Sequence, residues 1–292
     1  MPFWQKARSL PSLRLDPRFS PKLRASFLIP VHRCDDVLER TVLAVRDYLT
    51  SRFPHDFEII VIPNGTEGAS GHDCKVAHAL AQRFPEVKVT PNVSQPGKGL
   101  ALRTGFAQSL GQWIFLMDAD FPYDLAFFGE AARLLAGGVD FVTGNRRLPQ
   151  SRFDIPVTVL HLVYRRHLTG ILFNRLVRLL FPIAVTDTQA GIKAMSRRMA
   201  TAAFSRQICP GFFFDIEFFL CCAGSGFRSA EVPVTLFLDS EKSTVQLVRE
   251  SLLAAVWLAK IRRKFARNGY ASDAPATATT ALNGSKLAAD QR

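Results

Sequence analysis

Two aspartates, Asp118 and Asp120, are the residues whose type and spacing most clearly suggest chemistry. They stand two positions apart and directly follow an apolar run at residues 113–117 that is typical of a buried strand. Two carboxylates at the end of one strand supply the oxygen ligands that Mg²⁺ or Mn²⁺ prefers. Such a cation neutralises a diphosphate leaving group. The pair therefore predicts a metal site, although aspartates also occur in ordinary solvated turns.

A second candidate is the segment Gly97-Lys98-Gly99, which opens an expected helix at residues 99–110. Glycines permit close approach to the backbone, and a helix N-terminus beside a lysine favours phosphate or another anion. A plain loop with a solvated lysine would contain the same residues. Because Lys98 precedes the two aspartates along the chain, the pair Asp118 and Asp120 becomes a stronger indication of phosphate chemistry.

Strands and helices are expected to alternate in the first half of the chain and so to position these residues. Apolar runs predict strands at residues 26–31, 57–62, 87–89, 113–117 and 139–143, with helices at 35–49, 73–84, 99–110 and 125–135. Such alternation indicates an α/β fold with a doubly wound, mainly parallel, Rossmann-like sheet. In such sheets ligands bind beyond the carboxyl ends of the strands. Both Pro63-Asn64-Gly65 and Asp118-Ala119-Asp120 lie at such ends.

The composition narrows the class of partner. The net charge of +12 favours an anionic partner, and the absence of any nucleic-acid-binding motif favours phosphate groups or a membrane surface over nucleic acid. Five cysteines without C-x-x-C spacing indicate reduced thiols. Neither a signal peptide nor an apolar run long enough to span a membrane is predicted. We therefore expect a cytoplasmic protein, peripheral at the cytoplasmic face of the membrane.

Two segments, at residues 157–181 and 245–264, combine apolar residues at helical spacing with many arginines and lysines. Amphipathic helices of this kind lie in a membrane surface. Core helices with solvated basic ends would have a similar composition. We favour peripheral contact with an anionic membrane because two such segments occur in one basic chain.

Seven segments carry a resemblance to a known family: SFLIPV, FEIIVIPNG, PGKGLALRTGF, WIFLMDAD, TDTQAGIKAMSR, FFFDIEFF and GFRSAEVPV. Over residues 26–264 the sequence resembles the family 2 glycosyltransferases of GT-A fold, and among them the dolichyl- and polyprenyl-phosphate mannose or glucose synthases. The resemblance implies a GT-A domain at residues 25–243 between a basic segment at 1–24 and an amphipathic basic helix at 244–268. A disordered tail is expected at 269–292.

The resemblance also implies the donor site. The nucleotide-sugar-binding residues that it implies are Pro30, Val31, Asn64, Lys98, Arg103, Asp118 and Lys242, and the metal ligands are Asp118 and Asp120, with Mg²⁺ or Mn²⁺ as cofactor. Asn64 stands where this family usually has an aspartate. Lys242 is displaced by one position from the lysine of the family's C-terminal flap. The first departure affects which nucleobase is bound, and the second affects how the C-terminal flap closes over the diphosphate.

The implied catalytic residues are Asp187, Asp215 and Glu217, and the implied acceptor-phosphate residues are Arg146, Arg147 and Arg166. A phosphate acceptor is already ionised at neutral pH, so Asp187 could orient the basic groups that hold the phosphate instead of removing a proton. Asp215 and Glu217 are two positions apart on an expected helix and do not share a face. One can therefore face the site while the other is structural, and we favour Asp215 for the site.

The expected function is the inverting transfer of a hexose from a nucleotide sugar, UDP-glucose or GDP-mannose, to a polyprenyl or dolichyl phosphate. Two alternatives stay open. The first is a family 2 transferase that acts on a glycan or small-molecule hydroxyl, which would need a catalytic base. The second is a non-catalytic, nucleotide-sugar-binding membrane scaffold, which the altered Pro63-Asn64 would suit but the intact Asp118 and Asp120 would not.

Overall fold

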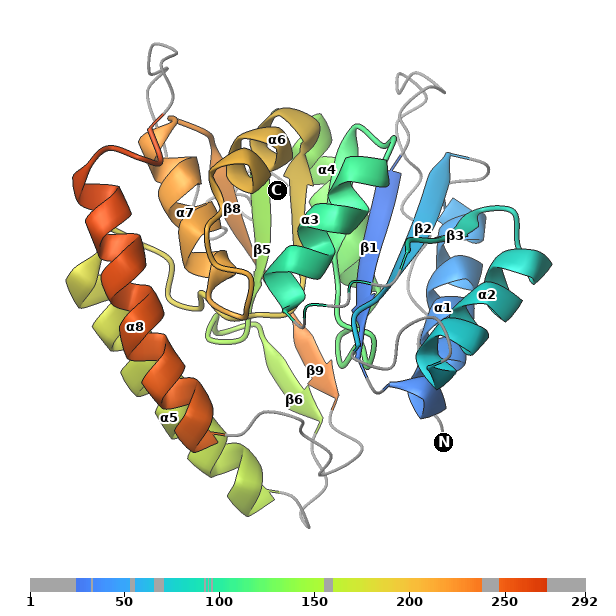
Figure 1. Ribbon diagram of the computed structural model, residues 1–292, viewed down its shortest axis with the longest axis horizontal. Helices are drawn as coiled ribbons and strands as arrows, with labels where there is room; N and C mark the ends of the chain where they lie inside the picture. The colour runs from blue at the N-terminus through green and yellow to red at the C-terminus, as the bar shows by residue number, and fades with distance from the viewer. Residues whose placement is uncertain are drawn as a thin grey trace, which may run out of the picture.

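The computed structural model describes residues 25–32, 34–52, 56–65, 71–91, 93, 95, 97–154, 160–237 and 247–271, without the side chains of 35–36, 73, 160–168 and 247–252. Its centre is a seven-stranded sheet (Figure 1). In spatial order the strands are β3 (Val87–Val89), β2 (Phe57–Pro63), β1 (Ala25–Val31), β4 (Trp113–Leu116), β7 (Lys193–Ser196), β5 (Phe141–Asn145) and β8 (Ser229–Pro233). Neighbours are parallel except β7, which is antiparallel to β4 and β5. The predicted mainly parallel α/β sheet is confirmed.

Helices cover both faces of the sheet. Successive side chains of a strand point to opposite faces, so apolar strands present an apolar surface on each face that helices bury. On β1, Phe27 and Ile29 belong to the core that includes α1 and α4, whereas Leu28 belongs to the core that includes α3, α6 and α7. Strands buried on both faces have largely apolar sequences, as β1 and β2 do apart from Ser26 and Glu58, which are hydrogen-bonded to each other. The helices are α1 (Asp35–Arg52), α2 (His72–Arg83), α3 (Lys98–Gln108), α4 (Ala126–Ala136), α5 (Leu160–Leu180), α6 (Arg197–Arg206), α7 (Phe214–Gly224) and α8 (Leu247–Ala266).

The reversed strand β7 decides which loops meet at the functional edge. Val31 pairs with Pro63, and Leu28 pairs with Leu116, so the carboxyl ends of β1, β2 and β4 share one edge. Leu116 also pairs with Lys193, the first residue of β7. Because β7 is antiparallel to β4, its amino end lies at that same edge. The loop before β7 therefore meets the aspartates that follow β4.

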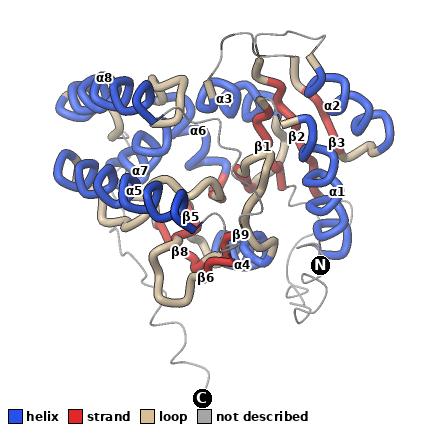
Figure 2. Tube along the Cα trace, turned by 90° about the horizontal axis from the view of Figure 1, so that it is seen from below, coloured by secondary structure: helices blue, strands red, loops and turns tan. Residues whose placement is uncertain are grey.

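Helices α5 and α8 lie side by side at one end of the molecule (Figures 1 and 2). Val177 of α5 and Leu258 of α8 are buried in the same core, and the rings of Phe181 and Phe265 lie 6.1 Å apart. Within the described part of the chain, no helix has the length and apolar character that crossing a membrane requires. The predicted membrane-surface role of these helices stays a prediction. A separate two-stranded parallel sheet joins β6 (Arg152–Asp154) to β9 (Thr235–Phe237).

The ordered chain extends past the predicted start of the tail at residue 269. Tyr270 is only 2% exposed and belongs to the core, because its hydroxyl meets the buried Glu217. The predicted tail is therefore wrong at its first residues. Its remainder from residue 272 and the basic segment 1–24 lie outside the described residues. The other domain boundaries stay predictions.

Candidate functional site

Lys98 and Asp118 form the centre of the site. Lys98 is the first residue of α3, and its ammonium forms an ion pair with Oδ1 of Asp118 beyond the end of β4. Burial alone would lower the pKa of Lys98, but the charges of Asp118 and Asp215 outweigh burial and raise it. Lys98 therefore stays a cation at neutral pH, beside the carboxylate that was predicted to bind a metal.

The second aspartate of the motif lies close to the first. The pKa of Asp120 is raised to about 6, by partial desolvation of its carboxyl group and by the negative charge of Asp118. Asp120 retains considerable solvent exposure, so we give most weight to the repulsion between the two carboxylates. A divalent cation removes such repulsion, and two carboxylates suit the oxygen preference of Mg²⁺ or Mn²⁺. The described residues contain no group of three or more candidate ligands, so Asp118 and Asp120 are the carboxylates that would hold a cation here.

The loop before β7 packs directly on Asp118, the first aspartate of the pair. A Cβ atom at Gly191 would clash with the carboxylate of Asp118, so only glycine allows this approach. The N–H of Gly191 donates to the hydroxyl of Tyr123 over 3.1 Å. Tyr123 is buried, and burial raises its pKa. Tyr123 was not predicted, and its place three residues after Asp120 is the only sequence signal for it.

Asp187 is held on both oxygens by Arg146. The Nε of Arg146 donates to Oδ2 over 2.7 Å, and its Nη2 donates to Oδ1 over 2.8 Å. Burial would raise the pKa of Asp187, but the hydrogen bonds and charge of Arg146 lower it to about 2. A carboxylate with this pKa is a poor base. The geometry thus supports the orienting role for Asp187, and it leaves Arg146 less free for an acceptor phosphate than predicted.

Arg147 and Asn174 connect helix α5 to this loop. Arg147 donates to the backbone carbonyls of Thr186 and Gly170, and Asn174 donates to the same carbonyl of Thr186. The amide oxygen of Asn174 accepts from the Thr188 hydroxyl over 2.9 Å. Arg147, predicted to bind the acceptor phosphate, is therefore used to fix the loop that carries Asp187. The side chain of Arg166 lies outside the described residues.

Asp215 and Lys193 form a buried ion pair behind Lys98 and Asp118. Their charged atoms are 3.0 Å apart, and Lys193 also donates to the carbonyl of Ala190. Burial raises the pKa of Asp215, and the cations Lys193 and Lys98 offset only part of this rise. Lys193 was missed in the sequence. A lysine at the start of a short strand signals a buried cation only once the partner carboxylate is known.

Glu217 points away from this charged cluster. It is fully buried and accepts hydrogen bonds from the N–H groups of Ile208 and Cys209, and from the Tyr270 hydroxyl. These contacts fix a loop and give Glu217 no contact with Asp118 or Asp215 in the described structure. The contacts of the two acids differ, since Asp215 pairs with Lys193 and Glu217 binds the 208–209 backbone, and the catalytic role expected of Asp215 stays a prediction. We assign Glu217 a positioning role instead of the catalytic one.

The loop at residues 207–211 also revises the role of the glycines beside Lys98. The carbonyls of Pro210 and Gly211 accept the N–H groups of Leu100 and Gly99, over 2.9 and 3.3 Å. These two N–H groups of the α3 N-terminus are therefore used within the protein and do not remain for a phosphate. A Cβ at Gly97 or Gly99 would clash with this loop. Phosphate binding at this helix is thus left to the ammonium of Lys98.

Arg103 faces the same loop. Its guanidinium donates to the carbonyl of Gln207, and its buried Nε has no hydrogen-bond partner among the residues that the structure describes. The structure places Arg103 in support of the 207–211 loop instead of in direct contact with the Lys98–Asp118 pair. Lys242, the remaining predicted donor contact, lies outside the described residues.

The residues predicted to contact the nucleobase lie at the neighbouring carboxyl ends of β1 and β2. The N–H of Asn64 donates to the carbonyl of Val31 over 2.8 Å, and Nδ1 of His32 lies 2.7 Å from the carbonyl of Asn64. Pro30 is half-buried beside them. The Asn64 side chain is 5% exposed, and its Oδ1 has no hydrogen-bond partner in the described structure. An unpaired buried acceptor of this kind suits a donor group on a ligand.

Curated relatives of this chain include a glycosyltransferase and several dolichyl-phosphate beta-glucosyltransferases. It is 27% identical over 253 residues to glycosyltransferase AglD of Haloferax volcanii, covering 84% of this chain and 39% of that protein. It is 28% identical over 208 residues to a dolichyl-phosphate beta-glucosyltransferase of Mus musculus, covering 68% and 62%. A dolichyl-phosphate beta-glucosyltransferase, ALG5D, of Trichomonas vaginalis is 24% identical, with 73% and 66% covered. This chain thus spans less than two thirds of the length of these relatives.

Solved structures confirm the GT-A fold. Glucosyl-3-phosphoglycerate synthase from Mycobacterium tuberculosis in complex with UDP superposes with a TM-score of 0.54 at 19% identity, covering 86% of this chain and 82% of that one. Its complex with Mn²⁺, UDP and phosphoglyceric acid superposes equally well, covering 82% and 78%. The model of the family described as glycosyl transferase family 2 matches residues 26–201. Since this match includes more than half of the 292 residues, the chain belongs to glycosyl transferase family 2.

Proposed function

We propose that this protein transfers a hexose from a nucleotide sugar to a polyprenyl or dolichyl phosphate, with inversion at the anomeric carbon. The observation that carries this proposal is the bidentate pairing of Asp187 with Arg146. A hydroxyl acceptor needs a base to take its proton, whereas a phosphate acceptor is already ionised. Asp187 is held as an anion with a pKa of about 2, so it is poorly suited to be that base. A phosphate acceptor therefore fits this site better.

The donor diphosphate is proposed to bind at Lys98, Asp118 and Asp120. Asp118 and Asp120 would hold Mg²⁺ or Mn²⁺, which when bound supplies positive charge to the leaving diphosphate. Lys98 adds a second positive charge at the same place, since its ammonium already contacts Asp118. Asp215 and Lys193 hold Lys98 in position from the buried side. Asn64 would accept a hydrogen bond from the base through its unpaired Oδ1.

The choice between UDP-glucose and GDP-mannose is proposed from the relatives. The curated relatives named dolichyl-phosphate beta-glucosyltransferase favour glucose, and the structural neighbour was crystallised with UDP. A uracil ring carries one N–H donor on its pairing edge, which suits the single unpaired acceptor of Asn64. UDP-glucose is therefore the donor that we would test first.

The test is a transfer assay with purified protein, Mg²⁺ or Mn²⁺, labelled UDP-glucose or GDP-mannose, and a polyprenyl phosphate in detergent. We expect label to move into the organic phase with UDP-glucose. Asp120→Asn should abolish the transfer, whereas Asp47→Asn, which removes an exposed carboxylate from α1, should preserve it. The anomeric configuration of the product, read by NMR, tests inversion.

Other outcomes would favour the two alternatives. If the donor is consumed only when a glycan or a small hydroxyl compound is added, the phosphate acceptor is wrong. Asp215, the remaining buried acid of the cluster, would then be the first candidate for a base. If no nucleotide sugar is turned over but UDP still raises the melting temperature in the presence of metal, the protein is a binding scaffold.

A further inference from the structure

Helix α5 has two opposite faces over its described side chains. Asn174 and Val177 are buried against the catalytic domain. Leu172, Leu176 and Leu179 are exposed to 62%, 43% and 83%. Their spacing of four and then three residues aligns these leucines in a single row on the helix, which we call the leucine stripe. A single exposed leucine is ordinary, but a row of three on one helix indicates an interaction surface.

The neighbouring helix α8 shows the same feature. Leu253 and Val256 are exposed, whereas Ala254 and Leu258 of the same turns are buried in the core. The two helices lie side by side and form one end of the molecule, far from α1 and α2 (Figure 1). Apolar side chains are therefore exposed on both helices of this end.

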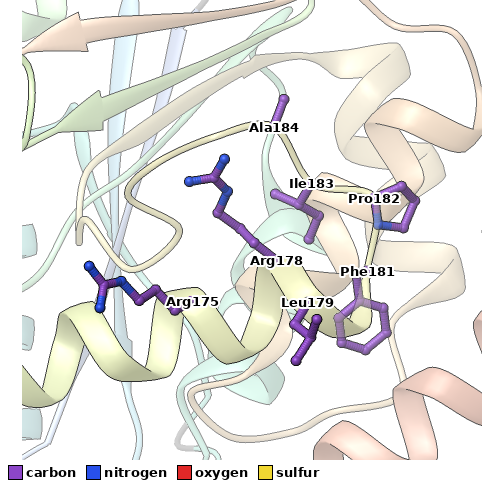
Figure 3. Close-up of a pocket in the computed structure, with 7 residues that line it drawn as sticks. All are labelled: Arg175, Arg178, Leu179, Phe181, Pro182, Ile183 and Ala184. Atoms are coloured by element: carbon purple, nitrogen blue, oxygen red, sulfur yellow. The ribbon is translucent and has the colours of Figure 1, made fainter.

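A pocket of about 560 Å³ opens beside the leucine stripe, between the last turns of α5 and the loop that follows (Figure 3). It is lined by Arg175, Arg178, Leu179, Phe181, Pro182, Ile183 and Ala184. The side chain of Arg178 leaves the helix toward Ala184 in the loop, Arg175 lies one turn away on the same helix, and Leu179 points away from Arg178 (Figure 3). The pocket thus has a basic side and an apolar side, and Leu179 belongs to both the pocket and the stripe.

The two arginines of this pocket have no direct partner within the described structure, although Arg178 acts on Glu231: burial raises the pKa of Glu231, and the charge of Arg178 offsets part of this rise. Neither Arg175 nor Arg178 has a hydrogen-bond or ion-pair partner among the described residues. Arg147 lies near enough that its pKa is lowered, mainly by burial and further by the charges of Arg146, Arg178 and Arg175. Guanidinium groups bind phosphate oxygens through planar pairs of donors. Arg146 and Arg147 are engaged by the Asp187 loop, so Arg175 and Arg178 are the arginines that offer free donors here.

We propose that α5 docks this protein on a bilayer that contains anionic phospholipid, with the leucine stripe in the headgroup region and a lipid phosphate bound by Arg175 and Arg178. The apolar stripe beside the pocket favours a bilayer over a soluble phosphate ester, and the unpaired arginines favour an anionic surface over an apolar protein partner. The net charge of +12 likewise favours binding to an anionic surface. This inference deepens the proposed function, on which it rests, by naming the surface at which the protein meets its lipid acceptor.

The position of the pocket gives docking a consequence for the site. The loop that lines it reaches Asp187 only three residues after Ala184. Arg147 and Asn174 tie α5 to Thr186 in the same loop. A lipid surface in contact with α5 is therefore also close to the loop that holds Asp187 and Arg146.

The experiment is co-sedimentation of the full chain with phosphatidylcholine vesicles that contain or lack phosphatidylserine, without nucleotide sugar. We expect binding only with phosphatidylserine, weakened by salt. Arg175→Gln with Arg178→Gln should reduce the affinity at least tenfold, since each arginine near an anionic surface contributes about fivefold. The control Arg40→Gln with Arg83→Gln removes two charges from α1 and α2 at the other end of the molecule and should change the affinity much less. Leu172→Gln with Leu179→Gln should weaken binding while keeping the charge.

Three results would overturn the proposal. The first is equal binding of the Arg175 and Arg178 variant and the wild type. The second is a melting temperature that inorganic phosphate raises in a protein that binds no vesicles, which would indicate a soluble ligand. The third is a dimer that the leucine variant dissociates, without vesicle binding, which would make the stripe a contact between two copies. Transfer by the wild type to polyprenyl phosphate in detergent is measured separately, so that a failure of docking and a failure of the transferase function are distinguished.

Discussion

The hydroxyl of Tyr270 donates a hydrogen bond to Oε1 of Glu217 over 2.7 Å. This hydrogen bond links the chain beyond α8 to the loop that lies beside Lys98. Glu217 also accepts the N–H groups of Ile208 and Cys209. The loop of these residues continues to Pro210, whose carbonyl accepts the N–H of Leu100 in the first turn of α3. The placement of Lys98 at the start of α3 therefore depends on a contact made near the end of the described chain.

Tyr270→Phe removes this hydrogen bond and keeps the ring. We expect the free energy of unfolding to fall by about 1–2 kcal/mol, because a buried carboxyl group loses one of its donors. The KM for the nucleotide sugar should rise more than kcat falls, since the lost contact supports the loop beside Lys98. Urea unfolding and steady-state kinetics measure the two effects. Ser225→Ala, which removes a 3.3 Å contact to the Tyr270 carbonyl and a side-chain contact to Cys221, is the control. An unchanged KM would reduce the Tyr270–Glu217 pair to a purely structural role.

Gly99→Ala should destabilise the protein and weaken donor binding. The new Cβ would lie 2.7 Å from the carbonyl oxygen of Cys209 and 3.0 Å from that of Gly211, and backbone atoms cannot move aside easily. A cost of about 1–3 kcal/mol is typical of such overpacking. Gly170→Ala on α5 is the matched control, because nothing lies within 4 Å of its Cβ, and alanine should stabilise the helix by up to about 1 kcal/mol. Urea unfolding compares the two variants, and equal stabilities would contradict the tight packing at Gly99.

Lys193→Met should be among the most damaging single substitutions of the site. It leaves Asp215 buried without its ion-pair partner, which costs about 3–5 kcal/mol in other proteins. The pKa of Asp215 is already raised, and losing Lys193 raises it further, so the folded state takes up a proton more readily than the unfolded state. The deficit relative to wild type should therefore shrink as the pH falls through the raised pKa of Asp215 in the variant. The double variant Lys193→Met with Asp215→Asn should recover much of the stability, and a deficit independent of pH would refute this account.

The Arg146–Asp187 pair should stabilise the fold in a pH-dependent way. The pKa of Asp187 is about 2 in the folded protein against an ordinary value of 3.8, which corresponds to about 2 kcal/mol of stability. This contribution is present above the ordinary pKa and is lost as the pH falls through about 2. Without Arg146, burial raises the pKa of Asp187, so the stability difference between wild type and Arg146→Gln should be largest at high pH and should shrink as the pH falls from the raised pKa of the variant toward about 2.

Urea unfolding at several pH values measures this difference. Arg83→Gln, which breaks an exposed pair with Glu39, is the control and should change stability by no more than about 1 kcal/mol at any pH. A difference for Arg146→Gln that grows as the pH falls would show that Asp187 does not depend on Arg146 for its ionised form.

The sequence was sufficient for the parts of the fold that follow from local patterns. The apolar runs that became β1 and β2, and the periodic segments that became α1 and α4, were predicted within a few residues. Asp118 and Asp120 were placed correctly beyond the end of β4, because the carboxyl end of a parallel strand is readable from the chain. Asp215 and Glu217 were predicted not to share a helix face, and they do have different partners, since residues two positions apart on a helix point in different directions.

What the sequence could not determine depends on pairing between distant segments. The register of Leu116 with Lys193 brings the Asp187 loop to Asp118 and Asp120, and no local pattern specifies that register. The glycines around Lys98 were predicted to admit a phosphate, but they admit the 207–211 loop, because the docking of α7 and Glu217 decides what approaches α3. Arg147 was expected at an acceptor phosphate and binds two backbone carbonyls.

By itself, the sequence determined the order of strands and helices in the first half of the chain. It also determined which residue types are available to the site: a pair of carboxylates, a lysine before it and an excess of basic residues. Only the tertiary structure decided how those charges are used. It paired Asp187 with Arg146 and buried Lys193 against Asp215. It left Arg175 and Arg178 without a direct partner among the described residues, beside exposed leucines. The physical reason is that the role of a charged side chain depends on its neighbours within a few ångströms, and the fold draws those neighbours from distant parts of the chain.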